Sequence, residues 1–287
     1  MAVTPWGFRD ILPEEAAARE RITDTVRAVF RARGYLPVET PLLEDRMTLE
    51  ASGGRMADTP FKLFDDDGRV LVVRHDNTLP IVRLVSSRLK QHELPLRLRY
   101  EAPVVREQAR FAGMARQFTQ LGFELVGDGG AEADAEMASL AIEAMDALGV
   151  PDCRMVCGSV LPFQLLLARC GDAALATDAL ALVHANNFVD LDHRVAQSGV
   201  SEAMARAITE LPRQHGGLEA LDRVDELLAC AGVTEQATAE LRGLYAQLGD
   251  RARALSFDFS IMNSFDYYTG LVFKAYAAGM ADALGSG

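Results

Sequence analysis

The sequence has no long apolar run and no leader-like N-terminus. No segment reaches about 18 consecutive apolar residues, the length that a membrane-spanning helix needs. Residues 1–10 lack the basic and then apolar order of a signal peptide. We therefore expect a soluble, cytoplasmic protein without membrane contacts, and its hydrophobic content of 49% is enough to bury an ordinary core.

Cysteine and histidine are scarce and are not spaced for metal binding. The five histidines form no metal-spaced pair, and the four cysteines show no C-x-x-C motif. We interpret the cysteines as buried, reduced thiols and expect neither a disulfide nor a metal site. They are Cys153, Cys157, Cys170 and Cys230.

Positive charge is also in short supply. The chain has 29 Lys and Arg residues against 41 Asp and Glu residues, which gives a formal net charge of −12. Proteins that bind nucleic acid generally need clustered basic side chains to contact the phosphates. We therefore expect no nucleic acid among its partners.

The pattern that is present mixes helices and strands. Pro13 stands at a plausible first helical position, and Gly34 ends the helix just after Arg33. Segment 35–41 holds two prolines, which favour an edge or interface strand, and Asp65-Asp66-Asp67-Gly68 predicts a hairpin turn. Further strands are predicted at residues 61–64, 69–74, 96–105, 115–126, 255–261 and 271–276. One further helix is predicted to start near Asn77 or Thr78, and another is predicted to cover residues 131–148.

Residues 160–250 are almost entirely helical in pattern and rich in Ala and Leu. Strand patterns occur on both sides of this block. That order favours an α+β fold with a mainly antiparallel sheet flanked by helices over alternating βαβ units. We predict a discontinuous core domain of residues 1–160 and 252–287, with a helical insertion at residues 161–251.

The predicted strand 115–126 carries polar side chains on one face. Gln120 and Glu124 flank Gly122, whose missing side chain would leave room for a ligand at the backbone. An amide and a carboxylate across such a gap suit a cationic or multi-donor ligand. Arg106, at the end of the preceding strand, could grip a carboxylate or phosphate. On spacing alone, we favour the simpler interpretation, an exposed face with an ordinary surface ion pair. The other face can pack beneath the sheet through Ala115, Thr119, Leu121, Phe123 and Leu125.

Two further polar clusters border predicted strands. Residues 266–270, Asp-Tyr-Tyr-Thr-Gly, are either part of a site or a turn of packed tyrosine rings. Residues 74–78 lie between a strand and a helix start, where we favour simple capping by Asn77 or Thr78. No glycine-rich phosphate loop and no Ser-His-Asp or Cys-His arrangement stands out, so the residues alone identify no catalytic group.

These segments, taken in order, resemble class II aminoacyl-tRNA synthetases, and histidyl-tRNA synthetase in particular. The resemblance covers nearly the whole chain and implies a core of that fold. In that family the first motif builds the dimer interface. The matching segments are residues 4–10 (the N-terminal opening), 34–41 (the first motif), 106–120 with Arg116-Gln117-Phe118 (the second motif), 122–124 (Gly-Phe-Glu) and 266–268 (Asp-Tyr-Tyr).

The resemblance implies a histidine pocket. Glu124 and the Tyr268 hydroxyl would hold the imidazole at its two nitrogens, and Arg106 would lie near the ligand carboxylate. The ammonium group would be received by Asp76, Thr78 and Gln120. The implied histidine-binding residues are thus Asp76, Thr78, Arg106, Gln120, Glu124, Tyr267 and Tyr268.

Departures from the synthetases fall mainly on residues that handle ATP. Asn263 stands where the synthetases carry an arginine that stabilises the activated phosphate, and an amide cannot replace a fixed cation. Gln108 and Met114 stand where a glutamate and an arginine would seat ATP. In the pocket itself, Asp76 is one methylene shorter than the synthetase glutamate, and His75 replaces a proline.

A synthetase-like chain that keeps the amino-acid pocket but lacks the residues that bind ATP resembles the ATP phosphoribosyltransferase regulatory subunits. Residues 269–273, Thr-Gly-Leu-Val-Phe, also look like that family. This resemblance implies a non-catalytic, allosteric chain without a cofactor, which binds histidine, dimerises through residues 34–41 and assembles with a short catalytic phosphoribosyltransferase subunit. It would mediate feedback control of the first step of histidine biosynthesis. The alternatives are an active or truncated histidyl-tRNA synthetase and an interaction protein with a vestigial pocket.

Overall fold

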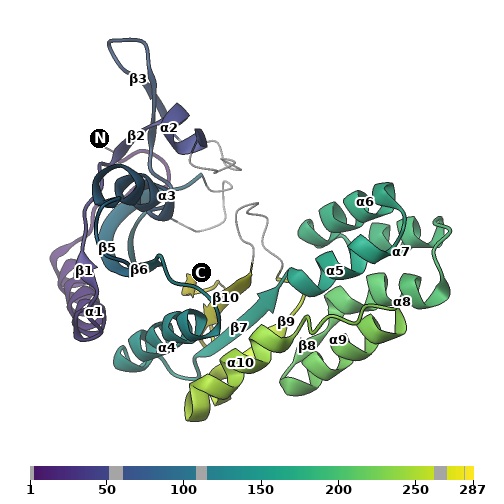
Figure 1. Cartoon of the computed structure of the whole chain (residues 1–287). Coiled ribbons are helices and arrows are strands. Elements are labelled where there is room, and N and C mark those ends of the chain that lie inside the picture. Colours follow the sequence, from purple (N-terminus) through teal and green to yellow (C-terminus); the bar gives the residue numbers. More distant parts are fainter. Residues whose placement is uncertain (1–2, 52–60, 108–114, 262–269, 281) are drawn as a thin grey trace. The chain divides into compact units, whose positions relative to one another are not determined.

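The computed structural model describes residues 3–51, 61–107, 115–261, 270–280 and 282–287. Contacts divide the chain into two compact units, residues 1–128 and 129–287, and each unit is described by itself. Figure 1 labels most of the helices and strands of both units. Among the described residues, no helix is long and apolar enough to cross a membrane.

A long helix and a three-stranded sheet form the base of the first unit. Helix α1 (Pro13–Ala32) begins at the predicted proline, and the ring centroid of its Phe30 lies 4.8 Å from that of Phe123 in the sheet. The strand order is β1-β5-β6. Strand β5 (Leu96–Val105) pairs antiparallel with β6 (Gln117–Val126), and β1 (Leu36–Pro37) is a parallel edge strand. The predicted helix, edge strand and strand pair are confirmed.

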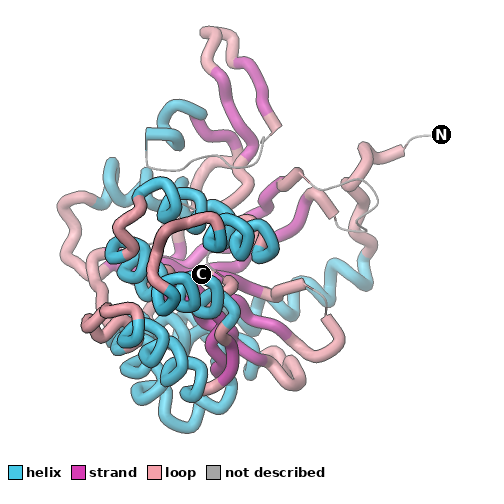
Figure 2. Tube along the Cα trace, turned by 90° about the vertical axis from the view of Figure 1, so that its right-hand side faces the viewer, coloured by secondary structure: helices cyan, strands magenta, loops and turns pink. Residues whose placement is uncertain are grey.

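A second, antiparallel sheet of the first unit carries the predicted hairpin. Its order is β2-β4-β3, with β2 (Leu43–Asp45), β4 (Val70–Val73) and β3 (Lys62–Phe64). Gly68 closes the hairpin turn at φ +84°, a conformation that favours glycine. The hairpin projects at the top of Figures 1 and 2. Strand β2 and helix α2 (Arg46–Ala51) were not predicted, because neither is long enough to show a periodic pattern.

Helix α3 covers the face of the β5–β6 pair that lies opposite α1. It spans Thr78–Leu84, with the start where it was predicted, and continues into a π-helix at Val85–Leu89. Ile81 of α3 packs against Leu98 and Tyr100 of β5. These two β5 residues point away from the face that contacts α1, because they alternate with Arg99, the partner of Phe123. The first turn of α3 is therefore held against the sheet.

The second unit contains a five-stranded sheet in the order β11-β10-β7-β9-β8. The strands predicted at residues 255–261 and 271–276 are confirmed as β9 and β10, although β9 ends at Asp258 and not at Ile261. The central strand β7 was not predicted, because consecutive buried positions at its end hide the alternation of a half-buried strand. The bounds are β7 Arg154–Ser159, β8 His215–Gly216, β9 Leu255–Asp258, β10 Leu271–Tyr276 and β11 Gly285–Ser286.

Pairing between described strands is mainly antiparallel, as predicted. Only β1–β5 and β7–β9 run parallel among the strand pairs of the described ranges. The described strands are distributed over three sheets, two in the first unit and one in the second.

Helices make up most of the remaining described part of the second unit. Helix α4 (Ala131–Ala147) is followed by Gly149 at φ +66°, which confirms the predicted stop. The predicted helical block is confirmed between β7 and β9, and Figure 1 shows α5 to α9 gathered together. The assignment of residues 161–251 as an insertion into a core of 1–160 and 252–287 stays a prediction. The helices are α5 Leu161–Arg169, α6 Ala173–His184, α7 Phe188–Ala196, α8 Glu202–Glu210, α9 Leu218–Cys230 and α10 Ala239–Leu248.

All four cysteines are free thiols, but they are not all buried. Cys157 is buried in β7, and burial raises the pKa of its thiol to about 12. Cys230 is exposed, which corrects the expectation of a buried thiol. Helix α9 buries the stripe that contains Val224, Leu227 and Leu228, and Cys230 at its last position falls outside that stripe.

Candidate ligand-binding site

Five predicted site residues meet in the first unit, above one face of the β5–β6 pair. Strand β6 supplies an amide and a carboxylate, the loop between β4 and α3 supplies a second carboxylate, and α3 supplies a hydroxyl at its first residue. A guanidinium comes from the residue that follows β5. The five are Asp76, Thr78, Arg106, Gln120 and Glu124.

The polar face of β6 is enclosed. Gln120 and Glu124 pair across the strands with Ala102 and Leu98, which are buried beneath α3 and its loop. Both polar residues are partly buried and hydrogen-bonded to residues 76–78. The interpretation favoured from spacing alone, an exposed face with an ordinary surface ion pair, is therefore wrong.

Asp76 is surrounded by donors. Its Oδ2 accepts from Gln120 Nε2 at 3.0 Å and from an Arg106 terminal nitrogen at 3.3 Å, and its Oδ1 accepts from the Thr78 backbone N–H at 2.7 Å. Burial would raise the pKa of Asp76, but these hydrogen bonds and the Arg106 charge outweigh burial and hold the pKa below its usual value. Asp76 is therefore an ionised carboxylate at neutral pH.

Glu124 behaves in the opposite way. Burial raises its pKa to about 7, the hydrogen bond from Thr78 opposes that rise, and the negative charge of Asp76 adds to it. Thr78 Oγ1 donates to Glu124 Oε1 at 2.9 Å. Two carboxyl groups on either side of one threonine thus differ in charge near neutral pH: Asp76 is fixed and Glu124 titrates.

Arg106 is anchored on one side and open on the other. Its Nε donates to the His75 carbonyl oxygen at 2.9 Å, and its guanidinium lies 5.1 Å from the Phe118 ring centroid. The side chain remains 39% exposed beside Asp76, so the guanidinium can still engage a second anion.

Gly122 does not leave the space that the sequence suggested. Tyr100 is its direct partner across the strands, and a Cβ on Gly122 would lie 2.2 Å from the Tyr100 hydroxyl oxygen. The expectation of room for a ligand at the Gly122 backbone is therefore wrong. The glycine is needed because a buried tyrosine ring lies over it.

The favoured interpretation of Asn77 and Thr78 as helix caps is also wrong. Asn77 stands at the N-cap of α3, but its side chain makes no capping hydrogen bond. Its Nδ2 donates to Gln120 Oε1 at 2.7 Å, and the Thr78 hydroxyl reaches Glu124. Both side chains point to β6, because the packing of α3 on the sheet places the start of the helix next to the polar side chains of that strand. The Asp76 carboxylate accepts the Thr78 backbone N–H instead.

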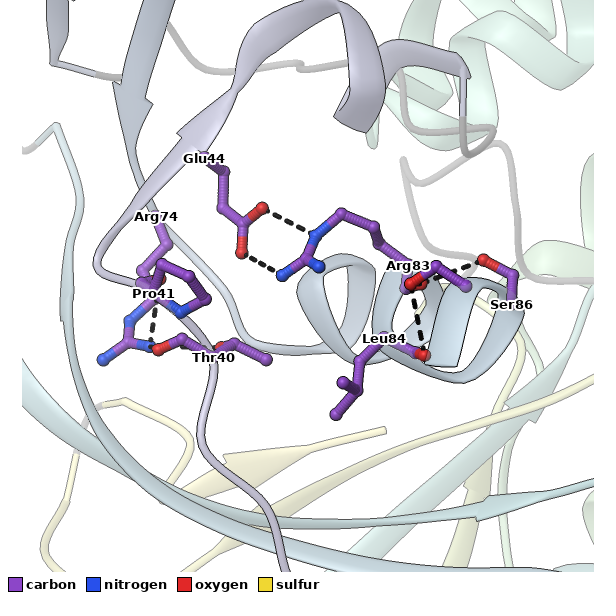
Figure 3. Close-up of polar contacts among 8 residues, drawn as sticks. Thr40, Pro41, Glu44, Arg74, Arg83, Leu84 and Ser86 are labelled. Carbon is purple, nitrogen blue, oxygen red and sulfur yellow. Dashed lines mark hydrogen bonds and ion pairs between the residues drawn. The ribbon is translucent and has the colours of Figure 1, made fainter. Parts of the chain in front are cut away.

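A buried arginine holds the loop that carries Asp76. Arg74 is only 4% exposed, and it donates from Nε to the Pro103 carbonyl oxygen at 2.8 Å and from a terminal nitrogen to the Thr40 carbonyl oxygen at 2.7 Å. Its backbone oxygen accepts from Val105 N–H at 3.0 Å. Figure 3 shows Arg74 directed to the segment of Thr40 and Pro41. Sequence reasoning named Arg74 within its cluster but assigned it no part.

An ion pair between a buried carboxylate and a partly buried guanidinium also holds α3. Both terminal oxygens of Glu44, on β2, accept from Arg83, on α3, at 2.8 Å each. Figure 3 shows this two-point contact, which holds the guanidinium in one plane with the carboxylate. Glu44 is 4% exposed. Sequence reasoning missed the pair, because its residues are 39 positions apart and no local pattern joins them.

Arg116, which belongs to the segment that resembles the second motif, contacts the N-terminal segment. Its guanidinium lies 4.9 Å from the Trp6 ring centroid and 4.4 Å from that of Phe61, and it pairs with Glu107 at 2.6 Å. Its backbone N–H donates to the Gly7 carbonyl oxygen at 2.8 Å. Arg116 therefore ties residues 6–7 to the start of β6.

Several predicted residues lie outside the described ranges. These are the tyrosines of the implied pocket and the three positions that depart from the synthetases at the ATP residues. Among the described residues, no group of three or more His, Cys, Asp and Glu side chains could hold a metal ion. The undescribed positions are Gln108, Met114, Asn263, Tyr267 and Tyr268.

The described cluster can bind a ligand that carries both charges. An ionised carboxylate and a guanidinium lie side by side, which suits an ammonium group next to a carboxylate. The second carboxyl group, titrating near pH 7, suits a basic group with a pKa in the same range. An amino acid with a weakly basic side chain has these properties.

Comparison with known sequences gives the family. The family described as Histidyl-tRNA synthetase matches residues 7–287. An ATP phosphoribosyltransferase regulatory subunit of Moorella thermoacetica is 37% identical over 285 residues, which cover 96% of this chain and 72% of that relative. The corresponding subunit of Symbiobacterium thermophilum is 36% identical over 290 residues, covering 99% and 72%.

Solved structures agree with the sequences. An ATP phosphoribosyltransferase regulatory subunit/histidyl-tRNA synthetase from Bacillus halodurans matches with a TM-score of 0.90 at 32% identity, over 100% of this chain and 75% of that one. A histidyl-tRNA synthetase from Nostoc sp. matches with a TM-score of 0.78 at 20% identity, over 96% and 65%, and shows the fold alone. The α+β fold with a class II synthetase-like core is confirmed. The chain belongs to the family of histidyl-tRNA synthetase-like ATP phosphoribosyltransferase regulatory subunits.

Proposed function

We propose that this chain binds histidine and, without catalysis of its own, regulates a separate catalytic ATP phosphoribosyltransferase subunit. The observation that carries the proposal is the arrangement of ionised Asp76 and titratable Glu124 on either side of Thr78, beside Arg106. Membership of the regulatory-subunit family supports the regulatory role.

Each charged part of histidine has a counterpart in this cluster. The ammonium group pairs with the Asp76 carboxylate, and the ligand carboxylate pairs with the open side of Arg106. The imidazole pairs with Glu124. Because an imidazole has a pKa of about 6.5 and that of Glu124 is about 7, the two groups can share one proton over the neutral range. Tyr267 and Tyr268 are proposed to complete the imidazole site.

Regulation requires a difference between two states of the complex. Histidine shifts the activity of the catalytic chain only if it binds one state more tightly than the other. In this role the chain gives feedback control of the first step of histidine biosynthesis in the cytoplasm, together with a short catalytic subunit. Self-association through residues 34–41 is part of the proposal, supported by the edge position of β1 and by Leu36, which is 66% exposed.

Reconstitution with a short catalytic subunit tests the proposal. Phosphoribosyl transfer is measured with and without histidine, using the matched variants Thr78→Ser and Thr78→Val. Thr78→Ser keeps the hydroxyl that contacts Glu124 and should keep the histidine response, whereas Thr78→Val should weaken histidine binding by about tenfold. Histidine that neither binds the chain nor alters transfer would refute the proposal.

A second assay separates the proposal from the synthetase alternative. Asn263, Gln108 and Met114 replace residues with which the synthetases bind ATP and stabilise its phosphates, so we expect no histidine-dependent exchange between ATP and pyrophosphate. Clear exchange by the purified chain would favour the synthetase alternative.

A further inference from the structure

Asn77 is a buried polar residue whose side chain does not cap its helix. It is 1% exposed, and its Nδ2 donates to Gln120 Oε1 at 2.7 Å. Gln120 in turn donates from Nε2 to Asp76 Oδ2 at 3.0 Å. Asn77, Gln120 and Asp76 therefore form a chain of hydrogen bonds that runs from the interior to the carboxylate of the candidate site.

The direction of these hydrogen bonds follows from the charge on Asp76. An ionised carboxylate can only accept, so Gln120 must turn its NH₂ end to Asp76. Its carbonyl oxygen then faces the other way and needs a donor, because a buried acceptor without a partner is costly. Asn77 supplies that donor. A Gln120 amide turned by 180° would set its oxygen against the Asp76 carboxylate and its NH₂ against the NH₂ of Asn77.

We propose that Asn77 is a positioning residue: by donating to Gln120 Oε1 it keeps the NH₂ end of that amide on Asp76, and so sets the carboxylate to receive the ammonium group of bound histidine. The part played by histidine rests on the function proposed above. The hydrogen-bond relay itself is a property of the unliganded chain.

Several groups hold the Asp76 carboxylate, and the Asn77 side chain pairs with the other end of the Gln120 amide. The charged and titratable residues near the relay include His75 and Asp76 on the same loop, Arg106 on the other side of the carboxylate, and Glu124 beyond Thr78. Arg106 and the Thr78 backbone N–H hold Asp76 whichever way the Gln120 amide points. Asn77 supplies the donor that the Gln120 oxygen needs in the orientation that the Asp76 charge requires, and so stabilises that orientation of the amide.

Two nearly isosteric variants test the relay. Asn77→Leu removes the donor, and Asn77→Asp replaces it with an acceptor. Histidine affinity is measured by titration calorimetry from about pH 5.5 to 8 and expressed as a ratio to the unmodified protein, so that titration of Glu124 and of histidine cancels. We expect Asn77→Leu to bind about tenfold more weakly, with little dependence of the ratio on pH. Asn77→Asp should be weakest at about pH 8 and should recover as the pH falls, because a protonated carboxyl group can again donate to Gln120.

A spectroscopic measurement on the unmodified chain tests the relay without ligand and without a variant. The side-chain amide of Gln120 is assigned by selective ¹⁵N labelling. One of its two protons should have a displaced chemical shift and should exchange slowly with solvent, because it is hydrogen-bonded to Asp76. That signature should be lost in Asn77→Leu. Equal affinities of Asn77→Leu and the unmodified protein, equal pH profiles of the two variants, or a freely exchanging Gln120 amide would each overturn the inference. If histidine gives no binding at all, the proposed function fails, while the amide signature still decides the relay.

Discussion

Glu124→Gln removes the one carboxyl group of the site that titrates near neutral pH. The change keeps the shape of the side chain and leaves a carbonyl oxygen that can accept the Thr78 hydroxyl. It removes the ionisation that burial opposes. The variant therefore separates the electrostatic effect of Glu124 from its packing.

The structure gives the size and the sign of the effect. Burial raises the pKa of Glu124 from an ordinary 4.5 to about 7. Below about pH 4.5 the group is protonated in both the folded and the unfolded chain. As the pH rises from about 4.5 to about 7, the folded state keeps a proton that the unfolded state has lost, and above pH 7 it buries a charge. The free energy of unfolding therefore falls over this range and then levels off. At 1.36 kcal/mol per pKa unit the loss approaches about 3 kcal/mol above pH 8.

We therefore expect Glu124→Gln to be about as stable as the unmodified chain near pH 4.5 and more stable by about 2–3 kcal/mol near pH 8. Urea unfolding at several pH values measures this difference, and fluorescence of Trp6, the only tryptophan, reports on the first unit. Glu93→Gln, which removes an exposed carboxyl group of the same unit, is the matched control. A stability difference between Glu124→Gln and the unmodified chain that stays constant with pH would refute the reasoning.

Three further predictions follow from buried contacts. Glu44→Ala leaves the Arg83 guanidinium partly buried without its two-point partner and should lower the free energy of unfolding by about 3 kcal/mol; a loss below about 1 kcal/mol in urea titration would contradict this. Gly122→Ala places a methyl group against the Tyr100 hydroxyl and should lower stability by about 2 kcal/mol, whereas an unchanged midpoint would show that the ring is free to move. The Cys157 thiol, with a pKa of about 12, should react with a thiol reagent only after unfolding, and fast reaction in the native protein would contradict its burial.

The fold was predictable where a local pattern carries it. Pro13 and Gly34 bound the first helix, the turn before Gly68 makes the hairpin, and two long strands follow one another at β5 and β6. Each of these features depends on residues that are close in sequence. The division of the strands over three sheets was not predictable, because it depends on which distant strands pair.

The site was predictable by residue type but not by geometry. Period-two counting placed Gln120 and Glu124 on one face correctly, yet it could not show that Tyr100 fills the space over Gly122. Asn77 was assigned to capping, because a helix start offers its N–H groups to any nearby polar side chain. Tertiary packing of α3 on the sheet overrode that local preference.

Titration of L-histidine into the purified chain tests the central claim most directly. Calorimetry should show saturable binding of histidine that is abolished by Glu124→Ala, and the number of protons exchanged on binding should change between about pH 6 and pH 8, because the pKa of Glu124 is about 7. Absence of heat, or binding that Glu124→Ala leaves unchanged, would contradict the account.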